Sequence, residues 1–384
     1  MTVSDWFFLN PHRNNFMPSV TRDRNLFLCH LDIQKQIQEI IERSFALKIP
    51  VKMILYGDWG VGKTHTIHHL AWWMEQNAAL YPTKTYLVEV GDVTKKSRFD
   101  ILIRRFLDQI GIREIIRLVH EYRQKTGVQV AKGLAECGVP KPICDVFNSF
   151  LMVAPGDTPP EAVQQAFNFL KAQDVKGSLS LGMTGTLSES EDFYGVLVSL
   201  GELYKKVDEK QLILIADEAA KLEAVEGDDP TNSHWLSTNR MIFDDQNVHF
   251  GFIYTISSKG RKGIPPFLVD AQIENRLGKD NYIELNPLAP ADVTSFLQRL
   301  FADFLDWNRI SEAVSSGTIP SGVYDQSSYP FEPSAKAAFV DYFNRTQQDS
   351  KPRDICKKLD AAAFIAFKGD KRVIDMDSLD KAGL

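Results

Sequence analysis

Apolar positions follow two patterns along this chain, continuous runs and helical spacing. Continuous runs predict buried strands in the sequences KMILYG after Val51, KTYLVEV from Lys84, QLILIA from Gln211, HFGFIYTI from His249 and NYIEL from Asn281. Apolar residues at helical spacing fill residues 31–47 and most of 97–210. Strands that alternate with helices predict an α/β fold with a parallel five-stranded sheet flanked by helices and a large helical insert.

The end of the chain has a different pattern. Pro287 and Pro290 follow the last predicted strand, and a helical region begins at Ala291. Pro352 suits the first turn of a later helix, because proline lacks the amide hydrogen that this turn leaves unused. These features predict an all-α domain at the C-terminal end.

A glycine-rich motif joins the first predicted strand to the helix that follows it. The segment fills G-x-x-x-x-G-K-[ST] without a mismatch, with Gly57, Asp58, Trp59, Gly60, Val61, Gly62, Lys63 and Thr64. Small residues let backbone amides curl around a polyphosphate at a helix N-terminus. Lys63 is expected at the β- and γ-phosphates and Thr64 at Mg²⁺. The alternative is a glycine turn without a ligand, but the flanking strand and helix are those that the motif requires.

A second acidic motif ends the third predicted strand. Asp217 and Glu218 follow the apolar run QLILIA, which is the Walker B pattern. Asp217 is expected to hold Mg²⁺, and Glu218 to polarise the water that attacks the γ-phosphate. The alternative for Asp217 is a helix N-cap. The two motifs together predict an ATPase with ATP and Mg²⁺ as its cofactors.

Polar and basic residues elsewhere are weaker candidates. The fourth predicted strand ends near Thr255, Ser257 and Ser258, and Ser257 or Ser258 is the candidate for sensing the γ-phosphate; a turn serine is the alternative. Arg276 precedes the fifth strand and Arg353 lies in the first turn of the Pro352 helix. From their position alone, solvated side chains are favoured over a phosphate contact for both arginines.

Composition narrows the classes of function. The 384 residues carry a net charge of −6, so no global basic field attracts nucleic acid or an anionic membrane. The N-terminus lacks a signal-peptide pattern, and no apolar run has the roughly 20 residues that span a bilayer. The four cysteines form no C-x-x-C pair. A cytoplasmic protein without a membrane partner is expected.

The motifs in this order resemble those of AAA+ ATPases, and within them the origin-recognition initiators and the ATPase regulators of transposition. The likeness rests on the two Walker motifs, the strand end near Ser257, the ENRLG that precedes IELNPL, and PRDI in the helical tail. It covers residues 31 to 378. It implies an arm and helix at 1–48, a P-loop core at 49–288 with the insert at about 97–210, and a helical lid at 289–384.

The resemblance also implies roles for the two arginines. Arg276 matches the arginine finger that reaches the γ-phosphate of a neighbouring subunit, and Arg353 matches sensor 2. A homo-oligomeric ring or filament follows from a finger that acts in trans. The aromatic arm and the 31–47 helix match the segment that packs on the adenine. No winged-helix segment follows the lid, so the usual DNA-reading element of the initiators is not expected.

Two further groups of residues have structural and functional interpretations. His65, His68 and His69 follow the P-loop, and packing of the helix is preferred to a metal site, with His65 also included among the nucleotide-binding residues. The insert carries a basic run in which acidic residues are interleaved, comprising Arg104, Arg105, Arg113, Arg117, Arg123 and Lys125. A solvated face is favoured over a contact with the DNA backbone.

These observations predict an assembly switch that binds and hydrolyses ATP, oligomerises with ATP and Mg²⁺, and regulates a DNA-related process in a mobile element, replication or an antiphage-type system. Duplex DNA is a possible partner, and a protein is expected to bind the helical insert. The alternative is a STAND-like signalling scaffold whose nucleotide state is controlled by a partner protein, with little hydrolysis. A remodelling motor is a third option, with Phe193-Tyr194-Gly195 as the only candidate pore loop.

Overall fold

The computed structural model describes residues 2–91, 99–173, 187, 190–222, 230–244, 250–346 and 350–384. The chain divides into two compact units. The sheet unit comprises Lys35–Gly57 and Leu70–Glu284, and the lid unit comprises Met1–Gln34, Asp58–His69 and Leu285–Leu384. Residues 177–189 of the predicted helical insert, apart from Leu187, and His249 of the fourth predicted strand lie outside the described residues.

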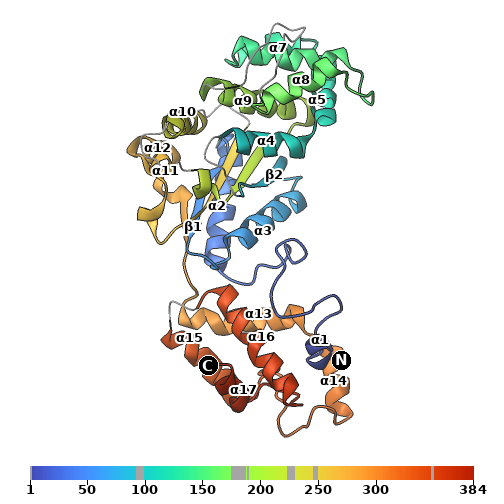
Figure 1. Ribbon diagram of the computed structural model, residues 1–384, viewed down its shortest axis with the longest axis vertical. Coiled ribbons are helices and arrows are strands. Elements are labelled where there is room, and N and C mark those ends of the chain that lie inside the picture. Colours follow the sequence, from blue (N-terminus) through green and yellow to red (C-terminus); the bar gives the residue numbers. More distant parts are fainter. Residues whose placement is uncertain are drawn as a thin grey trace. The chain divides into compact units, whose positions relative to one another are not determined.

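A five-stranded sheet forms the centre of the sheet unit (Figure 1). Its strands in spatial order are β2 (Thr83–Glu89), β3 (Gln211–Asp217), β4 (Phe250–Ser257), β1 (Lys52–Gly57) and β5 (Tyr282–Leu285). The pairs β2–β3, β3–β4 and β4–β1 are parallel. Strand β4 therefore lies between the P-loop strand and the Walker B strand, and the predicted fold class is confirmed.

The sheet is buried on both faces, which explains why its strands read as continuous apolar runs. On one face, alternate residues of β1, β3 and β4 share a single hydrophobic core with the insert helices, for example Ile54, Leu214 and Phe252. Residues of the opposite face, such as Leu55 and Ile215, are equally buried. The insert is therefore packed into the same core as the sheet.

The insert is helical, as predicted. In Figure 1 its helices run in teal and green across one end of the sheet unit. They are α4 (Phe99–Ile110), α5 (Ile112–Thr126), α6 (Val130–Glu136), α7 (Lys141–Ser149), α8 (Glu161–Leu170) and α9 (Ser190–Asp208), with the short turn η1 (Phe150–Met152). The last of these, α9, leads into β3 after two residues.

Further helices connect the strands. They are α2 (Leu31–Leu47), α3 (Lys63–Gln76), α10 (Pro230–Asp244), α11 (Pro266–Val269) and α12 (Ala271–Leu277), with the turns η2 (Ala219–Leu222), η3 (Arg261–Gly263) and η4 (Lys279–Asn281). Within the described residues, no helix is both long enough and apolar enough to cross a membrane.

The lid unit has its own hydrophobic core, formed by helices and the N-terminal arm. The helices are α1 (Val3–Trp6), α13 (Pro290–Phe304), α14 (Trp307–Ser315), α15 (Pro333–Arg345), α16 (Pro352–Lys368) and α17 (Met376–Lys381). Phe7 and Phe16 of the arm are completely buried in this core. The Trp6 indole donates to the carbonyl of Lys371 at 2.7 Å. The aromatic residues thus attach the arm to the lid helices.

Candidate active site

The P-loop begins where β1 ends and continues into the first turn of α3. Gly60 and Gly62 have φ angles of 83° and 104°, values that side chains disfavour and glycine accepts. Lys63 Nζ folds back and donates to the Asp58 carbonyl at 2.9 Å. Thr66 N and Oγ1 both donate to the Gly62 carbonyl. The loop is therefore closed into the curved form that a polyphosphate requires.

The Walker B carboxylate lies at the carboxyl edge of the sheet. Asp217 is the last residue of β3 and is 4% exposed. Its Oδ1 accepts hydrogen bonds from the Thr255 hydroxyl and, at 3.0 Å, from the Glu218 amide. The same amide also lies 3.0 Å from Thr255 Oγ1. The Asp217 carboxylate is thus held by its own strand end and by the neighbouring strand.

Glu218 has a strained backbone conformation. Its φ of 59° lies in the left-handed region, which is uncommon for a residue with a side chain and is found at functional sites more often than elsewhere. The carboxylate forms an ion pair with Lys221 of η2, at 2.5 Å between Oε2 and Nζ. Glu218 is followed directly by this short 3₁₀ helix, and its carboxylate is held by the helix's own lysine.

The end of β4 brings three hydroxyl residues to this edge, and the one bonded to Asp217 is Thr255, which is fully buried. Ser257 is paired in register with Gly57, the last residue of β1. The Ser258 amide donates to the Gly57 carbonyl at 2.9 Å, and the Ser258 hydroxyl donates to the Gly260 carbonyl. The sequence prediction named Ser257 or Ser258 as the sensor. Thr255 could be identified only from the strand register. Ala216 pairs with Tyr254, so the next residues along the two parallel strands are Asp217 and Thr255.

Arg276 lies near the C-terminal end of α12. Its Nε donates to Asp244 Oδ1 at the end of α10, and its Nη1 lies 3.4 Å from the Gln272 carbonyl. The side chain is 32% exposed and that of Asp244 is 50% exposed. The predicted finger is therefore at the surface of the sheet unit, where it is held by an ion pair within its own chain.

Arg353 is next to the P-loop, and both belong to the lid unit. Pro352 occupies the first turn of α16, as predicted, and Lys351 is the N-cap residue. The Arg353 amide donates to the Gly60 carbonyl at 3.4 Å. Its guanidinium carbon lies 5.2 Å from the centroid of the Trp59 ring. The exposed Trp59, unexplained by sequence reasoning, thus forms a cation–π contact with the predicted sensor 2.

Lys351 is a contact that sequence reasoning missed. Its Nζ lies 2.8 Å from Asp58 Oδ2, across 293 positions of sequence. The side chains are 19% and 29% exposed, respectively. No sequence motif predicts this ion pair, because a lysine before a proline is common at the start of a helix. Two cationic residues of the lid unit, Lys351 and Arg353, thus contact the P-loop from either side of Pro352.

The histidines after the P-loop hold the N-terminal arm, as the packing interpretation predicted. His65 Nε2 lies 2.7 Å from the Leu26 carbonyl, and His69 Nδ1 lies 2.9 Å from the Arg24 carbonyl. His30 Nε2 in turn lies 3.0 Å from the Val61 carbonyl of the P-loop. Burial lowers the pKa of all three imidazoles. A nucleotide-binding role for His65 stays a prediction.

Mg²⁺ matches the chemistry of the donor set that the sequence nominated. A threonine hydroxyl and a carboxylate are the hard oxygen ligands that this ion takes, with phosphates and water completing its shell. Thr64 is the second residue of α3, and Asp217 is buried at the end of β3. Among the described residues, no group of three or more His, Cys, Asp or Glu side chains forms a metal site.

The basic run of the insert is used largely for internal contacts. Arg105 Nη1 lies 2.5 Å from the Glu89 carbonyl and 2.6 Å from the Val90 carbonyl at the end of β2. Arg104 lies 3.5 Å from the Lys171 carbonyl, and Lys125 donates to the Val207 carbonyl. These residues therefore attach insert helices to one another and to the sheet edge.

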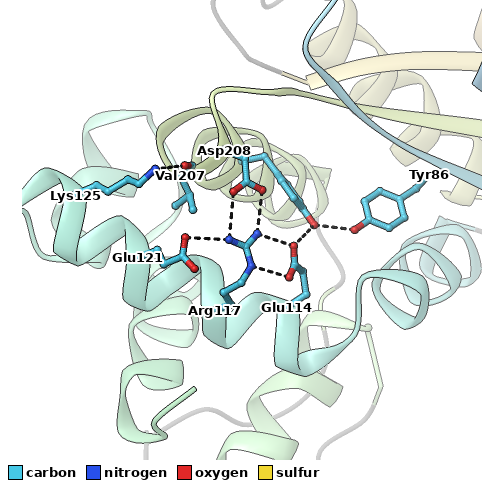
Figure 2. A network of polar contacts seen from close by, with 8 residues as sticks. Tyr86, Glu114, Arg117, Glu121, Lys125, Val207 and Asp208 are labelled. Carbon is cyan, nitrogen blue, oxygen red and sulfur yellow. Dashed lines mark hydrogen bonds and ion pairs between the residues drawn. The ribbon is translucent and has the colours of Figure 1, made fainter. Parts of the chain in front are cut away.

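Arg117 is the centre of a polar network between α5 and α9 (Figure 2). Its guanidinium forms ion pairs with Glu114 at 2.8 Å, Glu121 at 3.0 Å and Asp208 at 2.9 Å. The Tyr204 hydroxyl bonds to Glu114 at 3.2 Å and to the Tyr86 hydroxyl at 2.7 Å. The hydrogen bonds from Arg117 hold the pKa of Glu114 below its usual range. The network joins the insert to β2.

The candidate pore loop of the motor hypothesis is part of a helix. Phe193, Tyr194 and Gly195 lie within α9, and Phe193 is buried. Gly195 packs so closely on Pro140 that a Cβ there would lie 2.7 Å from the proline Cδ. A segment built into a helix and the core cannot act as an exposed loop. This segment therefore gives the motor hypothesis no support.

Two solved structures resemble this chain. Cdc6p from Pyrobaculum aerophilum has a TM-score of 0.52 and 13% sequence identity over 98% of this chain and 71% of its own. The ORC2 protein of Aeropyrum pernix, solved as ADPNP–ADP complexes, has a TM-score of 0.52 and 13% identity over 97% of this chain and 72% of its own. Neither a family profile nor a curated protein matches the sequence.

At this level of identity, the likeness concerns the fold. The resemblance inferred from the sequence is confirmed. The chain has the fold of Cdc6p and the ORC2 protein, which is the fold that the resemblance to AAA+ ATPases implied.

Proposed function

We infer that this chain is an ATP-binding and ATP-hydrolysing assembly switch of the AAA+ type. The observation that carries the proposal is the edge of the sheet where Gly57, Asp217 and Ser257 end adjacent parallel strands. Ligands of open α/β sheets bind outside the carboxyl ends of the strands. A glycine-rich loop follows Gly57 in the sequence, and Glu218, with its strained backbone, follows Asp217; both features favour phosphoryl chemistry.

Each polar group then has one role. Lys63 contacts the β- and γ-phosphates, while Thr64 and Asp217 hold Mg²⁺, which neutralises charge on the phosphates. Glu218 orients and polarises the attacking water. Thr255 fixes the Asp217 carboxylate by its hydroxyl, and Ser257 senses the terminal phosphate. Arg353 contributes positive charge from the lid.

Arg276 completes the site of a neighbouring copy. Its exposed position on α12, where the ion-pair partner Asp244 is also exposed, supports a finger that acts in trans. To act, its guanidinium exchanges Asp244 for the γ-phosphate of the next subunit. Hydrolysis then depends on assembly, because a charge that neutralises the transition state comes from the partner copy. Duplex DNA is the proposed template, and a DNA-related process in a mobile element, replication or an antiphage-type system is the proposed setting.

The test uses two variants of the proposed site. Lys63→Ala removes the phosphate cation and is expected to abolish nucleotide binding. Glu218→Gln keeps the shape of the side chain but not its basicity, so it is expected to bind ATP and to accumulate in the assembled state. A Glu218→Gln protein that hydrolyses ATP at the wild-type rate contradicts the assignment of Glu218 as the base.

A STAND-like scaffold is the second candidate, and one observation favours it. The insert shares the sheet core, and α9 leads into β3, the Walker B strand, after two residues. A protein bound to the insert is therefore mechanically connected to Asp217. This candidate predicts ADP that co-purifies with the protein and a slow hydrolysis rate that neither DNA nor protein concentration changes. The ATPase switch predicts the opposite response to both.

A further inference from the structure

Asp58 is an unexpected residue in a loop proposed to bind a polyanion. Its carbonyl accepts from Lys63 Nζ, the proposed phosphate cation, at 2.9 Å. Its carboxylate Oδ1 accepts from the Trp59 amide at 2.8 Å, and Oδ2 pairs with Lys351 at 2.8 Å. The residue that carries this negative charge is therefore in direct contact, through its carbonyl, with the ammonium group that is to bind the phosphates.

An uncompensated carboxylate in this position opposes nucleotide binding. Like charges a few ångströms apart repel strongly where water is partly excluded, and the Asp58 side chain is 29% exposed. Lys351 removes the repulsion, because its ammonium lies in contact with the carboxylate. The cation comes from the N-cap of α16, the helix whose first turn carries Arg353.

We propose that Lys351 is a positioning residue of the nucleotide site: it neutralises Asp58 and fixes the start of α16 on the P-loop, so that Arg353 is held at the loop before nucleotide binds. The proposal rests on the function proposed above. It gives two cationic residues of the lid different roles. Lys351 acts through Asp58, and Arg353 acts on the nucleotide.

Backbone contacts at the start of α16 support these separate roles of Lys351 and Arg353. The Arg353 amide donates to the Gly60 carbonyl, and a Cβ added to Gly60 would lie 3.4 Å from the Arg353 Cβ. The start of α16 is therefore packed directly on the loop at Gly60, and this contact needs the start of α16 to stay in place. Lys351 is the residue immediately before that turn, so its ion pair fixes the same junction from the other side.

The experiment is a charge cycle on the full chain. Binding of ADP with Mg²⁺ is measured by titration calorimetry for the wild type, Lys351→Met, Asp58→Asn, the double variant and Lys351→Arg, at low and high salt. Lys357→Met is the matched control, since Lys357 is exposed on the same helix and loses the same charge. Thermal unfolding without nucleotide shows which variants are folded.

Lys351→Met is expected to weaken ADP binding at least about fivefold, and the deficit is expected to shrink in high salt. Asp58→Asn is expected to bind as tightly as the wild type or more tightly, and the double variant is expected to return to within about threefold of the wild type. Lys351→Arg and Lys357→Met are expected to bind ADP with the affinity of the wild type. Rescue by removing Asp58 is a result that a purely structural lysine would not produce.

Other results overturn the proposal. A Lys351→Met protein that binds like the wild type, or a double variant that stays as weak as Lys351→Met, shows that Lys351 does not act through Asp58. If Lys351→Met fails to fold, weakened binding by Asp58→Asn alone refutes the idea. A wild-type protein that binds no nucleotide refutes the proposed function itself, and so separates the two failures.

Discussion

Arg276 and Asp244 form an ion pair on the surface of the sheet unit, between the last turns of α12 and α10. The proposed finger thus has a partner within its own chain, and a neighbouring subunit has to displace it. Exposed ion pairs contribute little free energy, about 0–1 kcal/mol, so displacing Asp244 from Arg276 requires little free energy. The pair sets a modest threshold for assembly without preventing it.

Asp244→Asn is the first prediction. Freeing Arg276 is expected to lower the protein concentration that gives half-maximal ATPase rate, by up to about fivefold, because the competing carboxylate is gone. The maximal rate per subunit is expected to stay unchanged. Asp280→Asn, an exposed acidic residue of the same unit, serves as the control. An unchanged concentration dependence would show that the ion pair does not restrain the finger.

Thr255→Val is the second prediction. Valine keeps the shape of threonine but removes the hydroxyl that bonds to Asp217 and accepts from the Glu218 amide. We expect the hydrolysis rate to fall about 10- to 100-fold, since a misplaced carboxylate impairs the chemistry. Nucleotide affinity measured without Mg²⁺ is expected to change little. Thr255→Ser retains the hydroxyl and should keep most of the activity; equal losses in both variants would point to packing instead.

Tyr204→Phe is the third prediction, and it concerns the insert. The buried hydroxyl joins Glu114 on α5 to Tyr86 on β2, so its loss leaves two partners with fewer hydrogen bonds (Figure 2). The free energy of unfolding is expected to fall by about 1–2 kcal/mol in urea denaturation. Tyr86→Phe keeps the bond to Glu114 and should cost less. A larger loss of stability in Tyr86→Phe than in Tyr204→Phe would contradict the role of Tyr204 as the residue that joins Glu114 to Tyr86.

Asp360→Asn is the fourth prediction, and it depends on pH. Burial raises the pKa of Asp360 in α16 from 3.8 to about 6, although the Phe16 amide donates to its Oδ1 at 2.8 Å. The folded state therefore binds more protons than the unfolded state between these values, and its stability falls as pH rises from about 4 to 6. Asparagine keeps the acceptor and does not ionise.

The variant should consequently be more stable than the wild type at pH 7.5, by about 1–2 kcal/mol after allowance for solvent screening. The difference should disappear near pH 4. Chemical denaturation at both pH values measures it. A difference that is independent of pH would show that ionisation of Asp360 does not weaken the attachment of the arm to the lid.

Local motifs explain what was predictable from the sequence. The P-loop and the Asp217-Glu218 pair are contiguous, because a phosphate cradle and a strand end each need neighbouring residues. The continuous apolar strands predicted a sheet buried on both faces, since such runs suit no half-exposed strand. Pro352 predicted the start of α16 by the same local logic.

The remaining features depend on residues that meet only in the fold. Lys351 meets Asp58 across 293 positions, and Arg117 meets Asp208 across 91. Neither pair has a spacing that a sequence reveals. Thr255 was passed over for Ser257 because the pairing register of β3 with β4, which aligns it beside Asp217, is set by the whole sheet. Phe193-Tyr194-Gly195 was considered as a pore loop from three residues alone, whereas the surrounding residues place it inside α9.

The most direct test of the account mixes two inactive proteins. Arg276→Ala keeps Glu218 but lacks the finger, whereas Glu218→Gln keeps the finger but lacks the base. If the finger acts in trans, the mixture regains ATP hydrolysis well above the sum of the separate rates, because Glu218→Gln subunits supply Arg276 to intact sites. The wild-type rate per subunit should then rise with protein concentration. A mixture no more active than its components, with a wild-type rate independent of concentration, would contradict an assembly-dependent ATPase.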